Sequence, residues 1–251
     1  MAERRFTWRP AAYDAVNNWR LGVTADLVDM PKVMFLINSL TERQEKGDCV
    51  FNALVTHLES IGVNSGTVPP VDLSRMFAYY QYRKRFGEVS EDNGASIFYA
   101  LKVLSGTGIC AEELWPYVEG NYAREPSPEA YRDALARPIG SYCQLVNLGD
   151  MLSCIASGFG FVGGISVYDS FESDVTERTG VVSMPGKGDK FLGGHAIYFC
   201  GYDLHKNAMQ FQNSWGLEWA SESNYPGHGW IPFEYLANPF LAGEFFTLRP
   251  K

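Results

Sequence analysis

Three segments of the chain carry residues whose types and order could build a nucleophilic catalytic site. The first is QEKGDCVFNAL, in which Cys49 follows Gly47 and Asp48 at the expected start of an amphipathic helix. A thiol at this place lies near the positive end of the helix dipole and near free backbone amides, which favour the thiolate over the thiol. We therefore expect Cys49 to have a lowered pKa and to act as a nucleophile, rather than to be a buried structural thiol.

Two later segments, GGHAIYFCGYD and FQNSWGLEW, could supply a base and a group that orients it. His195 opens an expected strand behind two glycines, and its imidazole could pair with the thiolate and then protonate a leaving group. Asn213 follows 18 residues later on the expected return strand, where its side-chain oxygen could accept the imidazole N–H under the cover of Trp215. A core histidine and a turn asparagine are the structural alternatives, which the joint occurrence of the three segments disfavours.

Helix signals fill the first half of the chain and must position the cysteine. Asp48 can cap a helix from Cys49 to about Ser60, because the apolar residues of this stretch recur with the helical period. Asp72 can cap a second helix that ends at about Phe86. Further helices are expected over residues 95–106 and from Ser127 to just before Pro138.

Strand signals dominate the second half of the chain and must position the base. Strands are expected over residues 161–168, 195–203, 208–215 and 244–248, with LHKN joining the middle two as a hairpin. This order predicts an α+β chain that forms a single domain, residues 1–251, with two lobes. The helical lobe covers about 45–130, and the β-rich lobe covers about 131–251 together with the N-terminal segment. A cleft between lobes is a common place for an active site.

Composition and charge exclude several functional classes. A net charge of −8 disfavours nucleic-acid binding, and no apolar run is long enough to span a bilayer, so we expect a cytoplasmic protein or one delivered into a host cell as an effector. The five cysteines contain no C-x-x-C and the four histidines form no H-E-x-x-H, so no metal site and no cofactor is expected. Structural roles are expected for Cys110, Cys143, Cys154 and Cys200.

Five motifs, in this order and spacing, resemble the papain-like (C1) cysteine peptidases, especially their bacterial branch: GDCVFNALVTHLE, DNGASIFYALKVL, CAEELWPY, GGHAIYFCGYD and NSWGLEW. His195 follows Cys49 by 146 residues, a separation typical of papain and the cathepsins. The resemblance covers about residues 22–236. It implies a two-lobed fold with a helical lobe, an antiparallel β-barrel-like lobe and the active site in the cleft between them.

The resemblance also implies roles for individual residues. Cys49 would be the nucleophile, His195 the general acid and base, and Asn213 the group that orients the imidazole. Gln44 would donate to the oxyanion beside the Cys49 amide. The residues expected to bind substrate are Asn93, Gly94 and Ala95, which would pair with the substrate backbone, Ile165 near an apolar specificity pocket, Gly194 and Trp215.

Two departures from the family pattern affect these expectations. Gln44 lies five residues before the cysteine, one fewer than in the family, so it is either an oxyanion donor on a shorter loop or an ordinary surface glutamine. Ala95 replaces the second glycine of an Asn-Gly-Gly edge, which still permits close backbone approach. No long inhibitory propeptide is recognisable before the catalytic segment, so control is expected to come from elsewhere, such as a regulatory protein partner whose identity is unknown.

These observations predict a cysteine peptidase, a hydrolase that cleaves peptide or protein substrates through a thioester acyl-enzyme. The shorter Gln44 loop motivates an alternative, a catalytically silent scaffold of the same fold that binds a peptide or protein. A third interpretation keeps the Cys-His chemistry but uses it to deamidate glutamine or to transfer an acyl group to an amine, which would make the protein a deamidase or acyltransferase effector.

Overall fold

The arrangement of the chain comes from a computed structural model, which describes residues 4–11, 30–36, 40–64, 66 and 71–249. Part of the resemblance lies over residues 22–29, outside these ranges. No helix in the described ranges combines the length and the apolar character that a bilayer crossing requires.

The described part of the chain up to residue 136 contains four α-helices: α1 (Cys49–Asn64), α2 (Arg75–Phe86), α3 (Ile97–Thr107) and α4 (Pro128–Ala136). Serine side chains cap the last three, because Ser74, Ser96 and Ser127 each accept an amide hydrogen bond from the residue three positions later. The predicted cap at Asp72 is therefore wrong, since Ser74 occupies that place. The predicted start of α4 is confirmed.

Among the described residues, seven strands form one antiparallel sheet, to which the N-terminal part of the chain contributes β1 (Val33–Phe35). The other six lie in the second half: β2 (Ser141–Gln144), β3 (Phe161–Tyr168), β4 (Phe191–Asp203), β5 (Ala208–Gln212), β6 (His228–Pro232) and β7 (Ala242–Arg249). Their order is β2-β7-β3-β4-β5-β6, and β1 pairs with β4. Strand β4 begins four residues before the predicted start, so that His195 lies within the strand and pairs with Ile165 of β3. The α+β prediction is confirmed.

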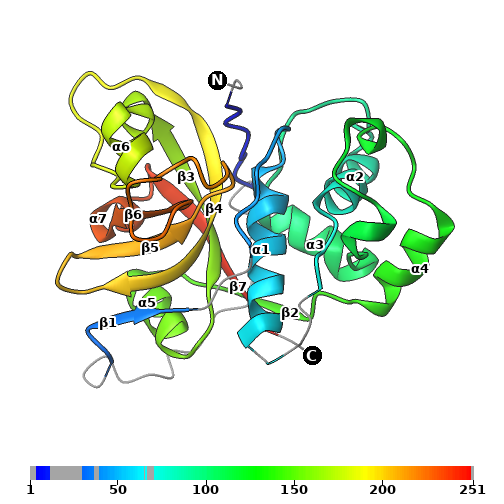
Figure 1. Cartoon of the computed structure of the whole chain (residues 1–251), viewed down its shortest axis with the longest axis horizontal. Helices are drawn as coiled ribbons and strands as arrows, with labels where there is room; N and C mark the ends of the chain where they lie inside the picture. The colour runs from blue at the N-terminus through cyan, green and yellow to red at the C-terminus, as the bar shows by residue number, and fades with distance from the viewer. Residues whose placement is uncertain (1–3, 12–29, 37–39, 65, 67–70, 250–251) are drawn as a thin grey trace.

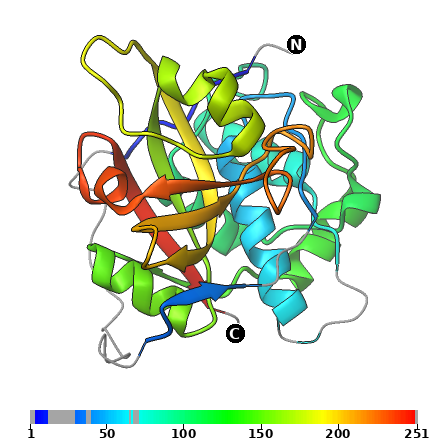
Figure 2. The ribbon, with the colours of Figure 1, turned by 60° about the vertical axis from the view of Figure 1, so that its left-hand side comes forward.

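Three short helices connect these strands: α5 (Leu148–Ala156), α6 (Asp174–Thr179) and α7 (Phe233–Ala237). Short 3-10 turns occupy Glu112–Leu114, Glu119–Asn121 and Asp169–Glu172. Figure 2 shows α5 and α6 near opposite ends of the sheet. The sequence prediction included none of these connecting helices.

Helix α1 stands between the sheet and the other helices of the first half (Figure 1). One core cluster joins the two sides, since it contains Leu54 of α1 and Leu101 of α3 together with Tyr198 of β4 and Phe246 of β7. A second cluster lies on the other face of the sheet and includes Ile165 and Phe199. The N-terminus of α1 is thereby fixed against β4, the strand that carries His195.

Candidate active site

Cys49 is the first residue of α1, and its side chain is fully buried. The helix starts here because the Asp48 carbonyl accepts two amides of the next turn, at 2.9 and 3.0 Å. The Asp48 carboxylate does not cap the helix, contrary to the prediction, because it is buried and interacts instead with Tyr117 and Arg75. The backbone of Ala196, the residue after His195, lies close enough to the Cys49 sulfur to act on its pKa, which it lowers.

His195 and Asn213 are joined directly by a hydrogen bond of 2.9 Å between Nε2 and the side-chain Oδ1. The same Oδ1 accepts the Ser214 amide at 2.9 Å, which fixes the orientation of the carboxamide. The Trp215 ring stacks on the imidazole with 4.9 Å between ring centroids and 25° between planes. All three side chains are nearly or fully buried, so this hydrogen bond is shielded from water.

This arrangement determines which imidazole nitrogen carries the proton in neutral His195. A carbonyl oxygen can only accept, so Nε2 must donate, and the lone pair of neutral imidazole is on Nδ1. The Nδ1 atom is buried and has no hydrogen-bond partner among the described residues. It is therefore available to accept a proton.

Residues Arg4–Ala11 run across this site, and we call them the N-terminal strap. The strap pairs on one side with Gly194, whose carbonyl accepts the Trp8 amide at 2.8 Å. On the other side the Ala95 amide donates to the Thr7 carbonyl at 3.2 Å. Both contacts are parallel β-bridges, so the strap occupies a groove between β4 and the start of α3.

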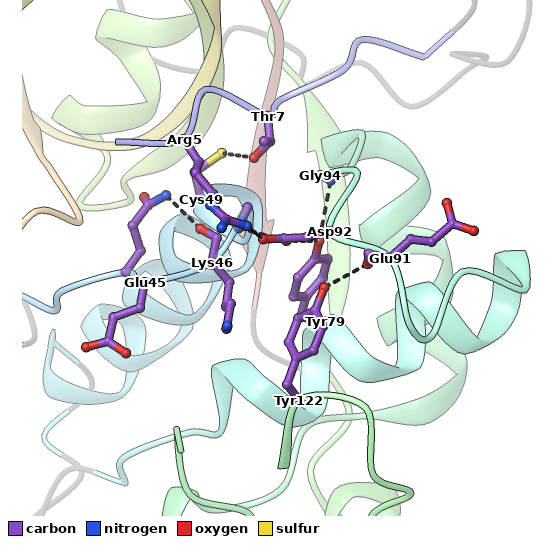
Figure 3. A network of polar contacts seen from close by, with 12 residues as sticks. Arg5, Thr7, Glu45, Lys46, Cys49, Tyr79, Glu91, Asp92, Gly94 and Tyr122 are labelled. Atoms are coloured by element: carbon purple, nitrogen blue, oxygen red, sulfur yellow. Dashed lines mark hydrogen bonds and ion pairs between the residues drawn. The ribbon is translucent and has the colours of Figure 1, made fainter. Parts of the chain in front are cut away.

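Strap side chains cover both candidate catalytic groups. The Thr7 hydroxyl lies 3.9 Å from the Cys49 sulfur, as Figure 3 shows. The Phe6 ring meets His195 edge-on with 6.4 Å between centroids, and it also meets Trp215 at 6.0 Å. The strap therefore keeps Cys49 and His195 out of contact with solvent.

Three arginines of the strap pair with acidic residues, and the longest of these contacts joins Arg9 to Glu88 at 3.5 Å. Arg4 forms ion pairs with Glu172 at 2.9 Å and with Glu177 at 2.7 Å, and its guanidinium lies over the Trp215 ring. Arg5 pairs with Asp92, which lies on the loop that precedes α3 (Figure 3).

Asp92 is the centre of a network that connects the strap to the loop before Cys49. Its Oδ1 accepts the Gly47 amide at 2.8 Å and the Tyr79 hydroxyl at 2.7 Å. A Cβ atom at Gly47 would approach this oxygen to 2.8 Å, so the close contact favours glycine at this position. The network therefore couples the position of the strap to the position of the nucleophile.

Burial sets the protonation of the site in this closed arrangement. It raises the pKa of the Cys49 thiol to about 11, and the neighbouring Asp48 carboxylate acts in the same direction. It lowers the pKa of His195 to about 4, although the Asn213 hydrogen bond opposes this shift. The expected lowering of the cysteine pKa by the helix terminus is therefore wrong for the covered site, because exclusion of water outweighs the dipole.

Gln44 is held by its neighbours. Its amide nitrogen donates to the Lys46 carbonyl at 3.1 Å, and its side-chain oxygen accepts the Ser214 hydroxyl at 2.5 Å. Its backbone amide donates to the Ser214 carbonyl at 2.8 Å. A cavity of about 210 Å³ lies beside Gln44 and Trp215.

The structure brings some of the predicted substrate-binding residues to the strap and leaves others elsewhere. Ala95 and Gly194 hydrogen-bond to it, and Gly94 lies so close that a Cβ atom would be 1.7 Å from the Thr7 carbonyl oxygen. The Asn93 side chain turns away and bonds to Glu91. Ile165 is fully buried in the core cluster on the other face of β3.

The strap residues and Glu244, which bonds to the strap, were not among the predicted site residues. The strap lies 42 residues before Cys49 at its Thr7 contact, and no local pattern relates two segments so far apart. Glu244 is the first residue of the expected strand EFFTL, and no motif in the sequence distinguishes it from an ordinary solvent-exposed glutamate. Among the described residues, no group of three or more His, Cys, Asp or Glu side chains could hold a metal ion.

Two of the known proteins that this chain resembles match most of its length at nearly 30% identity. No protein-family model matches the chain. The uncharacterized peptidase C1-like protein L477 of Acanthamoeba polyphaga mimivirus is 29% identical over 237 residues, which cover 89% of this chain and 74% of that protein. Xylellain, a cysteine protease from Xylella fastidiosa, is 28% identical with a TM-score of 0.86, and the match covers 99% of this chain and 98% of that one.

Two more distant structures share the fold alone. A Carica candamarcensis cysteine protease in complex with E-64 is 17% identical with a TM-score of 0.58, over 80% of this chain and 89% of that one. Digestive procathepsin L 3 of Tenebrio molitor is 13% identical with a TM-score of 0.60, over 85% of this chain and 68% of that one.

Proposed function

We propose that this chain, which is similar to papain-like (C1) cysteine peptidases in sequence and in fold, hydrolyses peptide bonds through Cys49, His195 and Asn213. The observation that carries the proposal is the His195–Asn213 hydrogen bond. This bond leaves the Nδ1 atom of His195 without a hydrogen-bond partner among the described residues. The residue after His195, Ala196, lies close enough to the Cys49 sulfur to act on its pKa. The substrate in this proposal is a peptide or an extended segment of a protein.

Substrate binding begins when a peptide replaces the strap. The Gly194 carbonyl and the Ala95 amide now bond to the strap backbone, and they are the groups that would hold the backbone of an extended peptide. Binding between these two edges places a carbonyl carbon beside Cys49 and limits its motion, which is the positioning that catalysis requires.

The chemical steps follow from the positions of the proton donors and acceptors. His195 Nδ1 takes the thiol proton, and the sulfur attacks the carbonyl carbon. The resulting imidazolium gives that proton to the leaving amine as the C–N bond breaks, which leaves a thioester on Cys49. Water then attacks the thioester with His195 as the base, and the reaction releases a carboxylic acid and restores the thiol.

Stabilisation of the oxyanion is assigned to the Cys49 amide and the Gln44 side chain. The Gln44 amide now donates to the Lys46 carbonyl, so it would have to turn from that acceptor toward the substrate oxygen. The adjacent cavity of about 210 Å³ leaves space on this side for a substrate group.

Substitution of the nucleophile tests the proposal. Cys49→Ala should abolish both peptide hydrolysis and covalent labelling by a thiol-directed epoxide, whereas the matched control Cys143→Ala, on β2, should retain both. Mass spectrometry of the products distinguishes cleavage from deamidation or acyl transfer. Hydrolysis that persists in Cys49→Ala would contradict the proposal.

One observation favours a second candidate, a silent binding scaffold. In the closed arrangement Cys49 is covered by the strap and Gln44 is engaged with Lys46. A scaffold should bind peptides without turnover, and its Cys49 should remain unreactive toward epoxides even after the strap contacts have been weakened.

A further inference from the structure

The strap places one large side chain, Trp8, into a pocket beside its two backbone contacts. A Cβ atom at Gly164 would lie 2.0 Å from the Trp8 ring, so the absence of a side chain at this position makes space for the indole. The ring also packs against the core cluster that contains Ala95 and Ala196. The walls of the pocket are therefore apolar, and Thr7, the strap residue before Trp8, lies beside Cys49.

A carboxylate closes the end of this pocket. The indole N–H of Trp8 donates to Glu244 Oε2 at 2.8 Å, and the Ala11 amide of the strap donates to Oε1 at 2.8 Å. Two groups outside the strap hold the same carboxylate, the Ser96 hydroxyl at 2.9 Å and the Ile97 amide at 3.0 Å. Two of the four donors to Glu244 thus belong to the strap, and the other two lie at the start of α3 and do not depend on it.

The backbone is distorted to aim Glu244 at the pocket. Between the pairs Val162–Phe246 and Gly164–Gly243, β7 has two residues where β3 has one, which is a β-bulge. Glu244 itself has φ of 53°, in the left-handed region that a residue with a side chain seldom adopts. Strain of this kind persists where the surrounding structure fixes it, and it is concentrated at functional sites.

We propose that this pocket selects a basic side chain, arginine or lysine, in the peptide that replaces the strap, and that Glu244 determines the selection. The inference rests on the proposed peptidase function, because the same backbone edges must hold the substrate. It replaces the expectation of an apolar specificity pocket at Ile165.

The chemistry of the pocket supports a cation over an apolar residue. All four described donors to Glu244 are uncharged, so no cation compensates the carboxylate through these hydrogen bonds. A side chain with an apolar stem and an N–H tip matches both the walls and the end of the pocket, as Trp8 does. Arginine and lysine add a positive charge to that match, and hydrogen bonds between charged partners are stronger than neutral ones.

Covalent labelling of Cys49 in the full-length chain tests the selection without requiring turnover. The probes are peptidyl epoxides that carry arginine, citrulline or norleucine at each position in turn on the amino side of the reactive group. Citrulline keeps the N–H groups without the charge, and norleucine has neither. At one position we expect the arginine probe to label Cys49 about tenfold faster than the citrulline probe, and the norleucine probe to be the slowest of the three. The Glu244→Gln variant, which is close in shape, should lose most of the difference between arginine and citrulline.

The outcomes separate this inference from the proposed function. Equal labelling rates for the three probes at every position would overturn the pocket assignment even if peptides are hydrolysed. An arginine preference at Cys49 without hydrolysis of any peptide would support the pocket and contradict the peptidase. Because the comparison of arginine with citrulline uses the unmodified chain, it remains decisive if Glu244→Gln fails to fold.

Discussion

The protonation of Cys49 and His195 depends on whether water reaches them. With a thiol pKa of about 11 and an imidazole pKa of about 4, both groups are neutral at pH 7 while the strap covers them. The charged pair, thiolate and imidazolium, needs hydration or substrate dipoles that the closed site excludes. Opening the site should therefore change its chemical state as well as its accessibility.

Asn213 positions the imidazole and should affect the rate more than binding. In Asn213→Ala the Nε2 proton loses its acceptor, so the ring can rotate and the other tautomer becomes populated. We expect kcat to fall about ten- to hundredfold with little change in KM. The pH dependence of kcat should shift as well, whereas an unchanged pH profile and an unchanged kcat would contradict the positioning role.

His57 makes stability depend on pH. It is fully buried on α1, its Nε2 accepts the Leu248 amide at 2.9 Å, and burial lowers its pKa to about 3. Below about pH 6.5 the unfolded chain binds a proton at this residue and the folded chain does not, so stability falls as the pH falls. Between pH 7 and pH 5 this residue should remove about 2 kcal/mol from the free energy of unfolding, measured by urea denaturation.

A matched substitution separates His57 from other titrating groups. His57→Gln keeps an oxygen that can accept the Leu248 amide, and it removes the titration. The variant should be less stable at pH 7, because the ring that stacks on Tyr198 is lost, and its stability should vary less between pH 7 and pH 5. An equally steep decline in the variant would assign the effect to other residues, such as His195.

The strap behaves as a separate element whose attachment is mainly ionic at one end. Arg4→Ala removes two ion pairs and the contact with the Trp215 ring, all of which are only partly exposed. We expect iodoacetamide to alkylate Cys49 about five- to tenfold faster in this variant, measured peptide by peptide with mass spectrometry.

The control for this prediction removes an arginine from an ion pair that does not involve the strap. Arg137→Ala breaks the pair with Asp133 on α4, and it should leave the alkylation rate of Cys49 unchanged. If both variants react at the wild-type rate, Arg4 does not hold the strap closed.

Elements with strong local signals were predictable, and those defined by distant pairing were not. The start of α4 at Ser127 and Pro128 and the turn at Leu204–Asn207 follow from capping and turn residues near in sequence. The strap has neither helical periodicity nor an alternating pattern, and it takes its conformation from Gly194 and Ala95. Likewise, the bulge at Glu244 arises from the register between β7 and β3, which a single segment does not encode.

The candidate site divides in the same way. The types and order of Cys49, His195 and Asn213 were readable from the sequence, because each lies in a motif with its own neighbours. The burial of all three side chains could not be predicted from these motifs, because it depends in part on the strap, Arg4–Ala11, which lies far from them in the sequence. The direction of the cysteine pKa was therefore predicted wrongly.

At the scale of the whole molecule, the two halves of the chain share a core cluster. Phe98 of α3 stacks on Phe246 of β7 with 6.0 Å between ring centroids, and both belong to the cluster that also contains Cys49. We propose that the helical and β-rich parts unfold together as one domain. Phe98→Ala should cost about 3 kcal/mol and should shift helical circular dichroism and tryptophan fluorescence to the same lower urea midpoint. Two separate transitions would contradict this coupling.

The covalent connection between the strap and the nucleophile has a kinetic consequence. Thr7 and Cys49 are 42 residues apart on one chain, so the strap competes with substrate at an effective concentration on the order of millimolar. That concentration does not change when the protein is diluted, so dilution alone cannot activate it. A free peptide must be present at high concentration or bind tightly to displace the strap. The rate of hydrolysis should therefore stay low until the substrate concentration approaches the effective concentration of the strap.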